Sequence, residues 1–239
     1  MQYLMLVRVD PGLAATTTIG DVEPWVEEGS RRGLRVQGDL VEEPGAARTV
    51  RVRDDDVLLS DGPFTETAEI VAGYDLLEAA DLAAAVDYAA RHPIAAIGAL
   101  EVRELQDDFF DRRQEAPVEV RAAGIDTLFL HVPQAGPAST VEVQERDLLD
   151  WIDRVEHDGT SLGGARLKEA TDATAAVVRV RDGELLVSRG PFAEVAEQIA
   201  GIDLIRAADL DEALTIAAAH PTSWIGAIEV RPFPVTPWS

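Results

Sequence analysis

Two copies of a Gly-Pro-Phe motif differ in the ionisable residue that comes before them. The first copy is Asp61-Gly-Pro-Phe64 and the second is Arg189-Gly-Pro-Phe192. Asp61 can serve as an acid, a base or a ligand anchor, but aspartate in a turn also accepts backbone N–H bonds, and Gly-Pro makes a tight corner. We therefore interpret Gly-Pro-Phe as structural and expect both rings to be buried. The change of sign gives a further hypothesis, an asymmetric functional centre in which Asp61 and Arg189 form an attractive pair.

Glutamates recur after each corner at a spacing of three residues. They are Glu66 and Glu69 in the first copy and Glu194 and Glu197 in the second. In a helical turn this spacing places both side chains on one side. A paired-carboxylate site would need burial that makes one group a proton donor and the other an acceptor. The alternative is a solvated face, or ion pairs with nearby arginines.

Histidine recurs at one place in both copies, as His92 and His220. Histidine can act as a general acid or base near neutral pH. The favoured alternative is a residue at a helix C-terminus, stabilised there by the macrodipole. His131 falls in an expected strand and His157 near a helix end, without partners at ligand spacing, so no metal site is predicted. No cysteine and no phosphate-binding loop are present, so neither thiolate chemistry nor a cofactor is predicted.

The recurrence of these residues reflects an internal duplication. Residues 51–103 align with residues 179–231 without a gap, and 31 of the 53 positions are identical. Such self-similarity indicates two related folding units. We expect a first repeat at 1–103, a linker at 104–124 and a second repeat at 125–239. Within the linker, Phe109-Phe110 is expected to pack on a domain surface.

Each repeat has the signals of an α+β fold. In the first repeat, strands are expected at 3–7, 49–53, 57–59, 72–77 and 97–102, and the second helix at 81–91. Asp81 and Asp209 are predicted N-caps, Ser139 begins a capping-box spacing, and Asp182-Gly183 predicts a type I′ turn. The order β-α-β-β-β-α-β is that of a ferredoxin-like repeat with an extra hairpin.

The two repeats are predicted to pack as an intrachain pseudo-dimer. The helices should cover one face of each sheet, so the other face needs a cover, and the partner repeat is the natural one. The result would resemble a dimeric α+β barrel made from one chain. Because the duplication already supplies that interface, we expect a monomer or a weak homo-oligomer.

Charge and composition exclude several kinds of partner. The formal net charge is −23, which opposes binding to phosphate backbones and to anionic lipid, so neither nucleic acid nor membrane is predicted as a partner. Apolar residues make up 46% of the chain, enough for packed cores. The N-terminus lacks the pattern of a signal peptide, and no apolar run has membrane-spanning length, so a cytoplasmic location is expected.

Taken together, four motifs resemble those of the YCII-related superfamily, in particular its DGPF subgroup. They are the Val-Arg-Val-Arg-Asp run ending at Asp54, Asp61-Gly-Pro-Phe64, the Gly-Tyr-Asp-Leu run ending at Leu76, and Gly-x-x-Glu-Val-Arg ending at Arg103. The resemblance implies a dimeric α+β barrel, a bacterial origin and a genetic association with extracytoplasmic-function sigma factors. It implies no defined activity. Some relatives are proposed to be enzymes with a His/Asp pair, and where they carry Asp-Pro after the second helix this chain has His92-Pro93 and His220-Pro221.

Two hypotheses for function follow. The first is a non-catalytic accessory or regulatory protein with a protein partner in a sigma-factor pathway. The second is a small-molecule-binding protein or enzyme that uses acid–base residues in the cleft between the repeats. The candidate residues for that cleft are Asp61, Glu66, Glu69, His92, Arg189, Glu194, Glu197 and His220.

Overall fold

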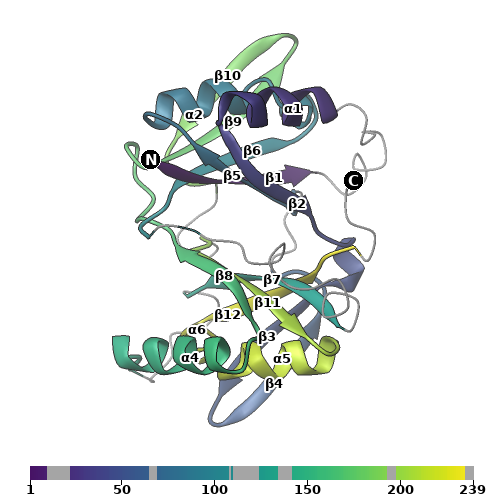
Figure 1. Ribbon diagram of the computed structural model, residues 1–239, viewed down its shortest axis with the longest axis vertical. Helices are drawn as coiled ribbons and strands as arrows, with labels where there is room; N and C mark the ends of the chain where they lie inside the picture. Colours follow the sequence, from purple (N-terminus) through teal and green to yellow (C-terminus); the bar gives the residue numbers. More distant parts are fainter. Residues whose placement is uncertain are drawn as a thin grey trace. The chain divides into compact units, whose positions relative to one another are not determined.

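The chain folds into two compact units, and neither unit is a single stretch of sequence (Figure 1). The computed structural model describes residues 1–9, 22–64, 69–107, 109, 124–133, 142–192 and 198–234. Unit 1 spans residues 1–40, 66–108 and 167–192, and unit 2 spans residues 41–65, 109–166 and 193–239. The units therefore do not coincide with the two sequence repeats.

Unit 1 contains an antiparallel sheet with the strand order β10-β9-β6-β1-β5-β2. The first repeat supplies β1 (Gln2–Val9), α1 (Glu23–Arg32), β2 (Arg35–Leu40), β5 (Ile70–Glu78), α2 (Leu82–Ala89), the 3₁₀ turn η4 (Pro93–Ala96) and β6 (Ala99–Glu104). The second repeat supplies β9 (Ala175–Arg181) and β10 (Glu184–Arg189). Trp25 of α1 and Ala85 of α2 pack with Met5, Leu100 and Val178 in one buried core on the helix-covered face of the sheet.

Unit 2 repeats this plan with the strand order β4-β3-β12-β7-β11-β8. The second repeat supplies β7 (Ile125–Val132), α4 (Glu145–His157), β8 (Ser161–Arg166), β11 (Gly201–Ala207), α5 (Leu210–Ala219), α6 (Pro221–Ile225) and β12 (Ala227–Pro232). The first repeat supplies η3 (Pro44–Ala46), β3 (Arg48–Arg53) and β4 (Asp56–Asp61). Trp151 of α4 and Ala213 of α5 pack on Phe129, Ile205 and Ile228 of the sheet.

The predicted α+β class and the ferredoxin-like repeats with an extra hairpin are confirmed. The orders β6-β1-β5-β2 and β12-β7-β11-β8 are the four ferredoxin-like strands, and the hairpins extend them. The sequence prediction missed one strand in each repeat, β2 and β8. Both are edge strands with glycine and polar residues, so they lack the apolar run that marks a buried strand. The packing of the two units against each other stays a prediction.

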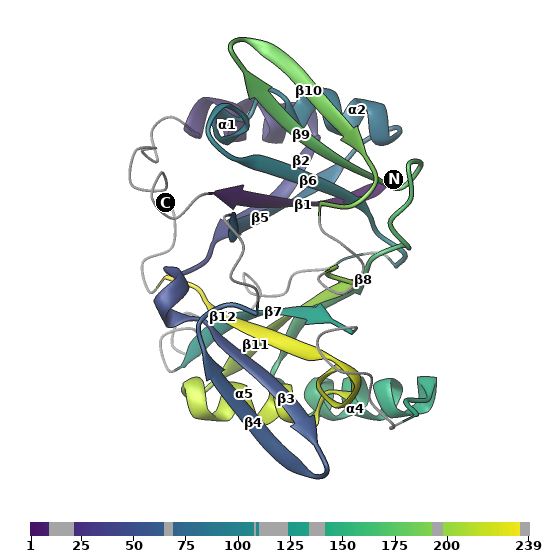
Figure 2. The same ribbon diagram turned by 180° about the vertical axis from the view of Figure 1, so that it is seen from behind.

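The extra hairpins are exchanged between the repeats. β9 of the second repeat pairs with β6 of the first, and β3 of the first pairs with β12 of the second (Figure 2). An arginine fixes each hairpin to the turn that follows the second helix of the other repeat. Arg181 donates to the carbonyl oxygens of Ala95 and Gly98 at 2.8 and 3.0 Å. Arg53 donates in the same way to three carbonyl oxygens, those of Ser223, Trp224 and Gly226.

Several local predictions are confirmed by the backbone. The Asp81 side chain accepts from the Ala84 N–H at 2.8 Å, and Asp209 accepts from the Glu212 N–H at 3.0 Å. Asp182 and Gly183 have φ values of 53° and 79°, as a type I′ turn requires. Ser139 lies outside the described residues. The capping box of α4 is instead formed by Gln144 and Asp147, immediately before and inside the helix.

The expected linker at 104–124 begins inside a strand. Glu104 is the last residue of β6, and the neighbouring Leu105 forms a β-bridge with Leu167. Phe109 is buried, as predicted for a packing residue, whereas Phe110 lies outside the described residues. Within the described part of the chain, no helix combines the length and apolar character needed to cross a membrane.

Candidate functional site

The structure places Asp61 and Arg189 in different units. Asp61 ends β4 in unit 2, where its side chain is 92% exposed and pairs with Arg48 at 3.1 Å. An exposed pair of this kind contributes little to stability. Arg189 ends β10 in unit 1 and is exposed. The Asp61–Arg189 pair therefore stays a prediction, and each residue is described by its own unit alone.

The Gly-Pro-Phe corners are held by glutamates of the terminal strands. The N–H of Phe64 donates to Glu229 at 2.9 Å, and the N–H of Phe192 donates to Glu101 at 3.4 Å. This supports the structural interpretation of the motif. The expectation that the rings are buried was wrong, because both are half-buried. The guanidinium of Arg51 lies 5.1 Å from the Phe64 ring centre, and that of Arg8 lies 4.3 Å from the Phe192 ring centre.

The glutamates after the corners do not converge among the described residues. Glu69 forms an ion pair with Arg179 at 2.7 Å, which is the alternative considered for this set. Glu66, Glu194 and Glu197 lie outside the described residues. The paired-carboxylate hypothesis therefore stays a prediction.

His92 and His220 both act as caps of the turn that follows them. Nδ1 of His92 accepts from the Ile94 N–H at 3.1 Å, and Nδ1 of His220 accepts from the Thr222 N–H at 3.0 Å. Burial and the nearby Arg35 lower the pKa of His92 to about 3, and burial with the nearby His131 lowers the pKa of His220 well below its ordinary value. Both rings are therefore neutral at pH 7. Since Nδ1 is an acceptor, the ring proton of each lies on Nε2.

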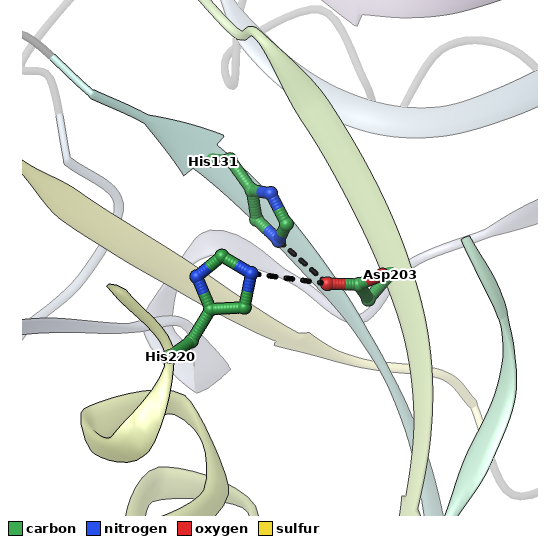
Figure 3. Close-up of side chains that lie close together, drawn as sticks. All are labelled: His131, Asp203 and His220. Atoms are coloured by element: carbon green, nitrogen blue, oxygen red, sulfur yellow. Dashed lines mark ion pairs between the residues drawn. The ribbon is translucent and has the colours of Figure 1, made fainter. Parts of the chain in front are cut away.

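In unit 2 the free end of one of these rings faces two further polar groups. His131, Asp203 and His220 lie together, with His131 Nε2 at 2.8 Å and His220 Nε2 at 3.8 Å from Oδ2 of Asp203 (Figure 3). We call these three residues the histidine–aspartate cluster. Their side chains are 12%, 17% and 2% exposed for His131, Asp203 and His220, respectively, so His220 is enclosed while the other two reach the surface in part.

Strand register brings the histidine–aspartate cluster together. β7 and β11 pair so that His131 faces Gly201 and Asp203 faces Phe129. Because side chains alternate along a strand, His131 shares a face with Phe129, and Asp203 shares it with Ile205. Both of those apolar residues pack under α4 and α5. His220 reaches the same place from the end of α5, against the Trp151 ring at 4.4 Å.

The three facing atoms have no hydrogen-bond partner within the described chain. They are Nε2 of His131, Oδ2 of Asp203 and Nε2 of His220, and all three are buried. The 2.8 Å approach of His131 Nε2 to Oδ2 of Asp203 is a close polar contact whose geometry is not that of a hydrogen bond. Buried polar atoms without hydrogen-bond partners are rare, so three at one point make the histidine–aspartate cluster a candidate functional site.

A metal ion fits the cluster poorly. The three ligand atoms lie within 4.8 Å of one another, a spacing that would suit a cation. However, the Thr222 N–H occupies Nδ1 of His220 and keeps the proton on Nε2, where a metal needs a lone pair. His131 and Asp203 would remain as two ligands, fewer than the three that catalytic zinc sites use. The arrangement suits a fixed N–H donor beside a His–Asp pair.

Unit 1 has the same backbone position but different chemistry. Asp75 matches Asp203 in the repeat, and Val7, which pairs with Gly73 as His131 pairs with Gly201, stands in the place of His131. Asp75 is bound by Arg35, whose Nε lies 2.6 Å from Oδ1. Burial raises the pKa of Asp75, and the Arg35 guanidinium opposes that rise. The carboxylate of unit 1 is thus satisfied within the protein.

Sequence reasoning found His220 but missed its partners. His131 and Asp203 are 72 positions apart, and only the pairing of β7 with β11 joins them. One signal was present in the sequence: an aspartate recurs at the same place in both repeats within otherwise apolar strands, as Asp75 and Asp203. A carboxylate in a buried strand needs a partner, which makes such a position a candidate.

Glycine is required opposite each of these aspartates. A Cβ at Gly164 would come within 2.1 Å of Oδ1 of Asp203. We expect Gly164→Ala to displace the carboxylate and to lower the free energy of unfolding by about 1–3 kcal/mol. Urea denaturation measures this. Gly45→Ala is the matched control, because nothing lies within 4 Å of that position, and equal losses in both variants would contradict the explanation.

Comparison with known proteins agrees with this fold. The model of the YCII-related domain matches residues 42–107 and 128–239, so the chain belongs to the YCII-related family. An uncharacterized protein of Rhizobium meliloti (strain 1021) is 47% identical over 72 residues. That match covers 28% of this chain and 55% of the relative, so the chain spans about half of the relative's length.

Proposed function

We propose that this YCII-related protein binds a small molecule and acts on it through the histidine–aspartate cluster of unit 2. The observation that supports the proposal most directly is the meeting of three buried polar atoms without hydrogen-bond partners in the described chain. At the matching place in unit 1, Arg35 binds the aspartate and Val7 stands in the position of His131. The two repeats therefore have the same backbone arrangement but different side-chain chemistry there.

Each residue of the cluster has a distinct part in this proposal. His220 is a neutral N–H donor in a fixed tautomer, suited to holding an oxygen or nitrogen of the ligand. His131 is partly exposed and is the group that exchanges a proton with the ligand. Asp203 places a carboxylate oxygen 2.8 Å from Nε2 of His131, where it would stabilise positive charge that develops on that ring during the exchange.

The proposed site differs from the cleft between repeats considered above, because its residues come from one unit. The regulatory role in a sigma-factor pathway stays a prediction from the family resemblance. It is the function that would remain if the cluster proves inert.

The proposal is tested by NMR on the full chain with labelled histidines. A panel of small acids, amines, amides and alcohols is screened for changes in the His131 and His220 ring signals. We expect binders whose affinity falls about tenfold or more in His131→Val, which introduces the residue of unit 1, because a lost polar partner in a buried site weakens binding by that order. His157→Val is the control, since His157 is exposed at the end of α4. A panel without binders, or binders unaffected by His131→Val, would refute the proposal.

A further inference from the structure

The two matching aspartates hold their carboxylates in the same orientation. A Cβ at Gly38 would meet Oδ1 of Asp75 at 2.1 Å, and a Cβ at Gly164 would meet Oδ1 of Asp203 at the same distance. In each unit, therefore, Oδ1 is the oxygen that faces the neighbouring edge strand, β2 or β8. In unit 2 the other oxygen, Oδ2, faces the two histidines.

In unit 1 a guanidinium from the edge strand β2 binds that oxygen. Arg35 pairs with Leu77 across the β2–β5 ladder, and its Nε donates to Oδ1 of Asp75. The Arg35 and Asp75 side chains are 15% and 7% exposed, so the pair is shielded from water. A charge-assisted hydrogen bond in such a place is stronger than the same bond in solvent.

In unit 2 the corresponding residue is a serine. Ser161 pairs with Ile205, the repeat counterpart of Leu77, and both edge strands have a register shift immediately after this pair. Within the described residues, both histidine contacts of Asp203 go to Oδ2, and no arginine or lysine forms an ion pair with Oδ1. The Asp203 side chain is also more exposed than that of Asp75, at 17% against 7%, and because its Oδ2 is buried this exposure lies elsewhere on the side chain.

We propose that Oδ1 of Asp203 binds a cationic N–H donor group of a small ligand, namely a guanidinium, an amidinium or a primary ammonium. Arg35 of unit 1 is the built-in counterpart of that group. This inference rests on the proposed function and names the class of ligand for the same site. Once bound, the cation lies beside His131, which stands 2.8 Å from the other carboxylate oxygen.

The test adds two simple probes, guanidinium chloride and methylammonium chloride, to the full chain at millimolar concentration. Binding of each probe is followed by NMR through the ring signals of His131 and His220. Tetramethylammonium chloride at equal ionic strength is the control, because it has the charge but no N–H. We expect saturable changes with the two probes and none with the control. Equal responses to all three salts would overturn the inference.

Two variants make the test specific. Ser161→Arg places an arginine where unit 1 has Arg35. We expect the affinity for guanidinium to fall by about tenfold or more, because the tethered arginine competes at a high effective concentration. Ser161→Ala is the matched control and should bind as the wild type does. Arg35→Ser is the reverse change, because it removes the guanidinium that binds Asp75. Millimolar guanidinium should therefore raise the free energy of unfolding of Arg35→Ser more than that of the wild type. Unchanged binding in Ser161→Arg would contradict the assignment.

The outcomes separate this inference from the proposed function. If the panel yields ligands that depend on His131 but the N–H cations do not bind, the ligand class alone is wrong. If neither the panel nor the probes bind, both proposals fail. Binding of Zn²⁺ alone with loss of the His220 Nε2 proton would replace the cation-donor assignment by a metal site.

Discussion

Glu101→Gln should lower the free energy of unfolding by about 3–5 kcal/mol, because it removes the charge that two buried guanidiniums share. Glu101 is 2% exposed and contacts Arg8 at 2.8 Å and Arg103 at 3.3 Å. Burial alone would raise the pKa of Glu101, but the two guanidiniums hold it below its ordinary value. Urea denaturation of the full chain measures the loss.

A matched control for that experiment lies on the surface. Glu28 also contacts two arginines, Arg32 at 2.7 Å and Arg91 at 3.3 Å, but all three side chains are solvated. Glu28→Gln should therefore change the free energy of unfolding far less than Glu101→Gln does, because a solvated ion pair adds little to stability. Similar losses in the two variants would show that the buried network of Glu101 is not a special source of stability.

Acid should destabilise the protein through the two capping histidines. The pKa of His92 is about 3 in the folded chain, and that of His220 is also lowered, whereas an unfolded histidine has a pKa near 6.5. Below about pH 6.5 the unfolded chain takes up protons that the folded chain does not. For His92, stability therefore falls as the pH falls from about 6.5 towards 3, by up to about 1.4 kcal/mol per pH unit, and His220 contributes in the same direction.

Asparagine variants isolate this effect. His92→Asn and His220→Asn keep an acceptor for the capped N–H but remove the titrating ring. In the double variant, the free energy of unfolding should depend less steeply on pH between about 6 and 4, as followed by urea denaturation at each pH. His157→Asn should leave the pH dependence unchanged, because that residue is exposed. An unaltered slope in the double variant would mean that the two rings are not kept neutral by burial.

The sequence predicted the features that depend on local interactions. The caps at Asp81 and Asp209 and the turn at Asp182-Gly183 each involve residues close in the chain, and the duplication indicated that they occur twice. The apolar strands and the ferredoxin-like order followed from the same patterns. The edge strands β2 and β8 were missed because an edge strand buries less apolar surface. Their sequences contain glycine and polar residues in place of an apolar run.

The sequence could not predict the features that depend on long-range register. The exchange of hairpins is decided by pairings such as Glu229 with Thr49, 180 positions apart. The meeting of His131 with Asp203 depends on the register of β7 and β11, where a slip of one residue would send the two side chains to opposite faces. No pattern within one element carries that information.

The hairpin exchange also has a consequence for inheritance. The glutamate that holds each Gly-Pro-Phe corner is encoded in the opposite half of the gene, Glu101 for Phe192 and Glu229 for Phe64. Arg53 and Arg181 likewise dock onto turns of the opposite half. The effect of a substitution in one hairpin therefore depends on the sequence of the other repeat. The two halves can diverge at the histidine–aspartate cluster, but neither can be lost, replaced or recombined alone without removing two strands from the sheet of the half that remains.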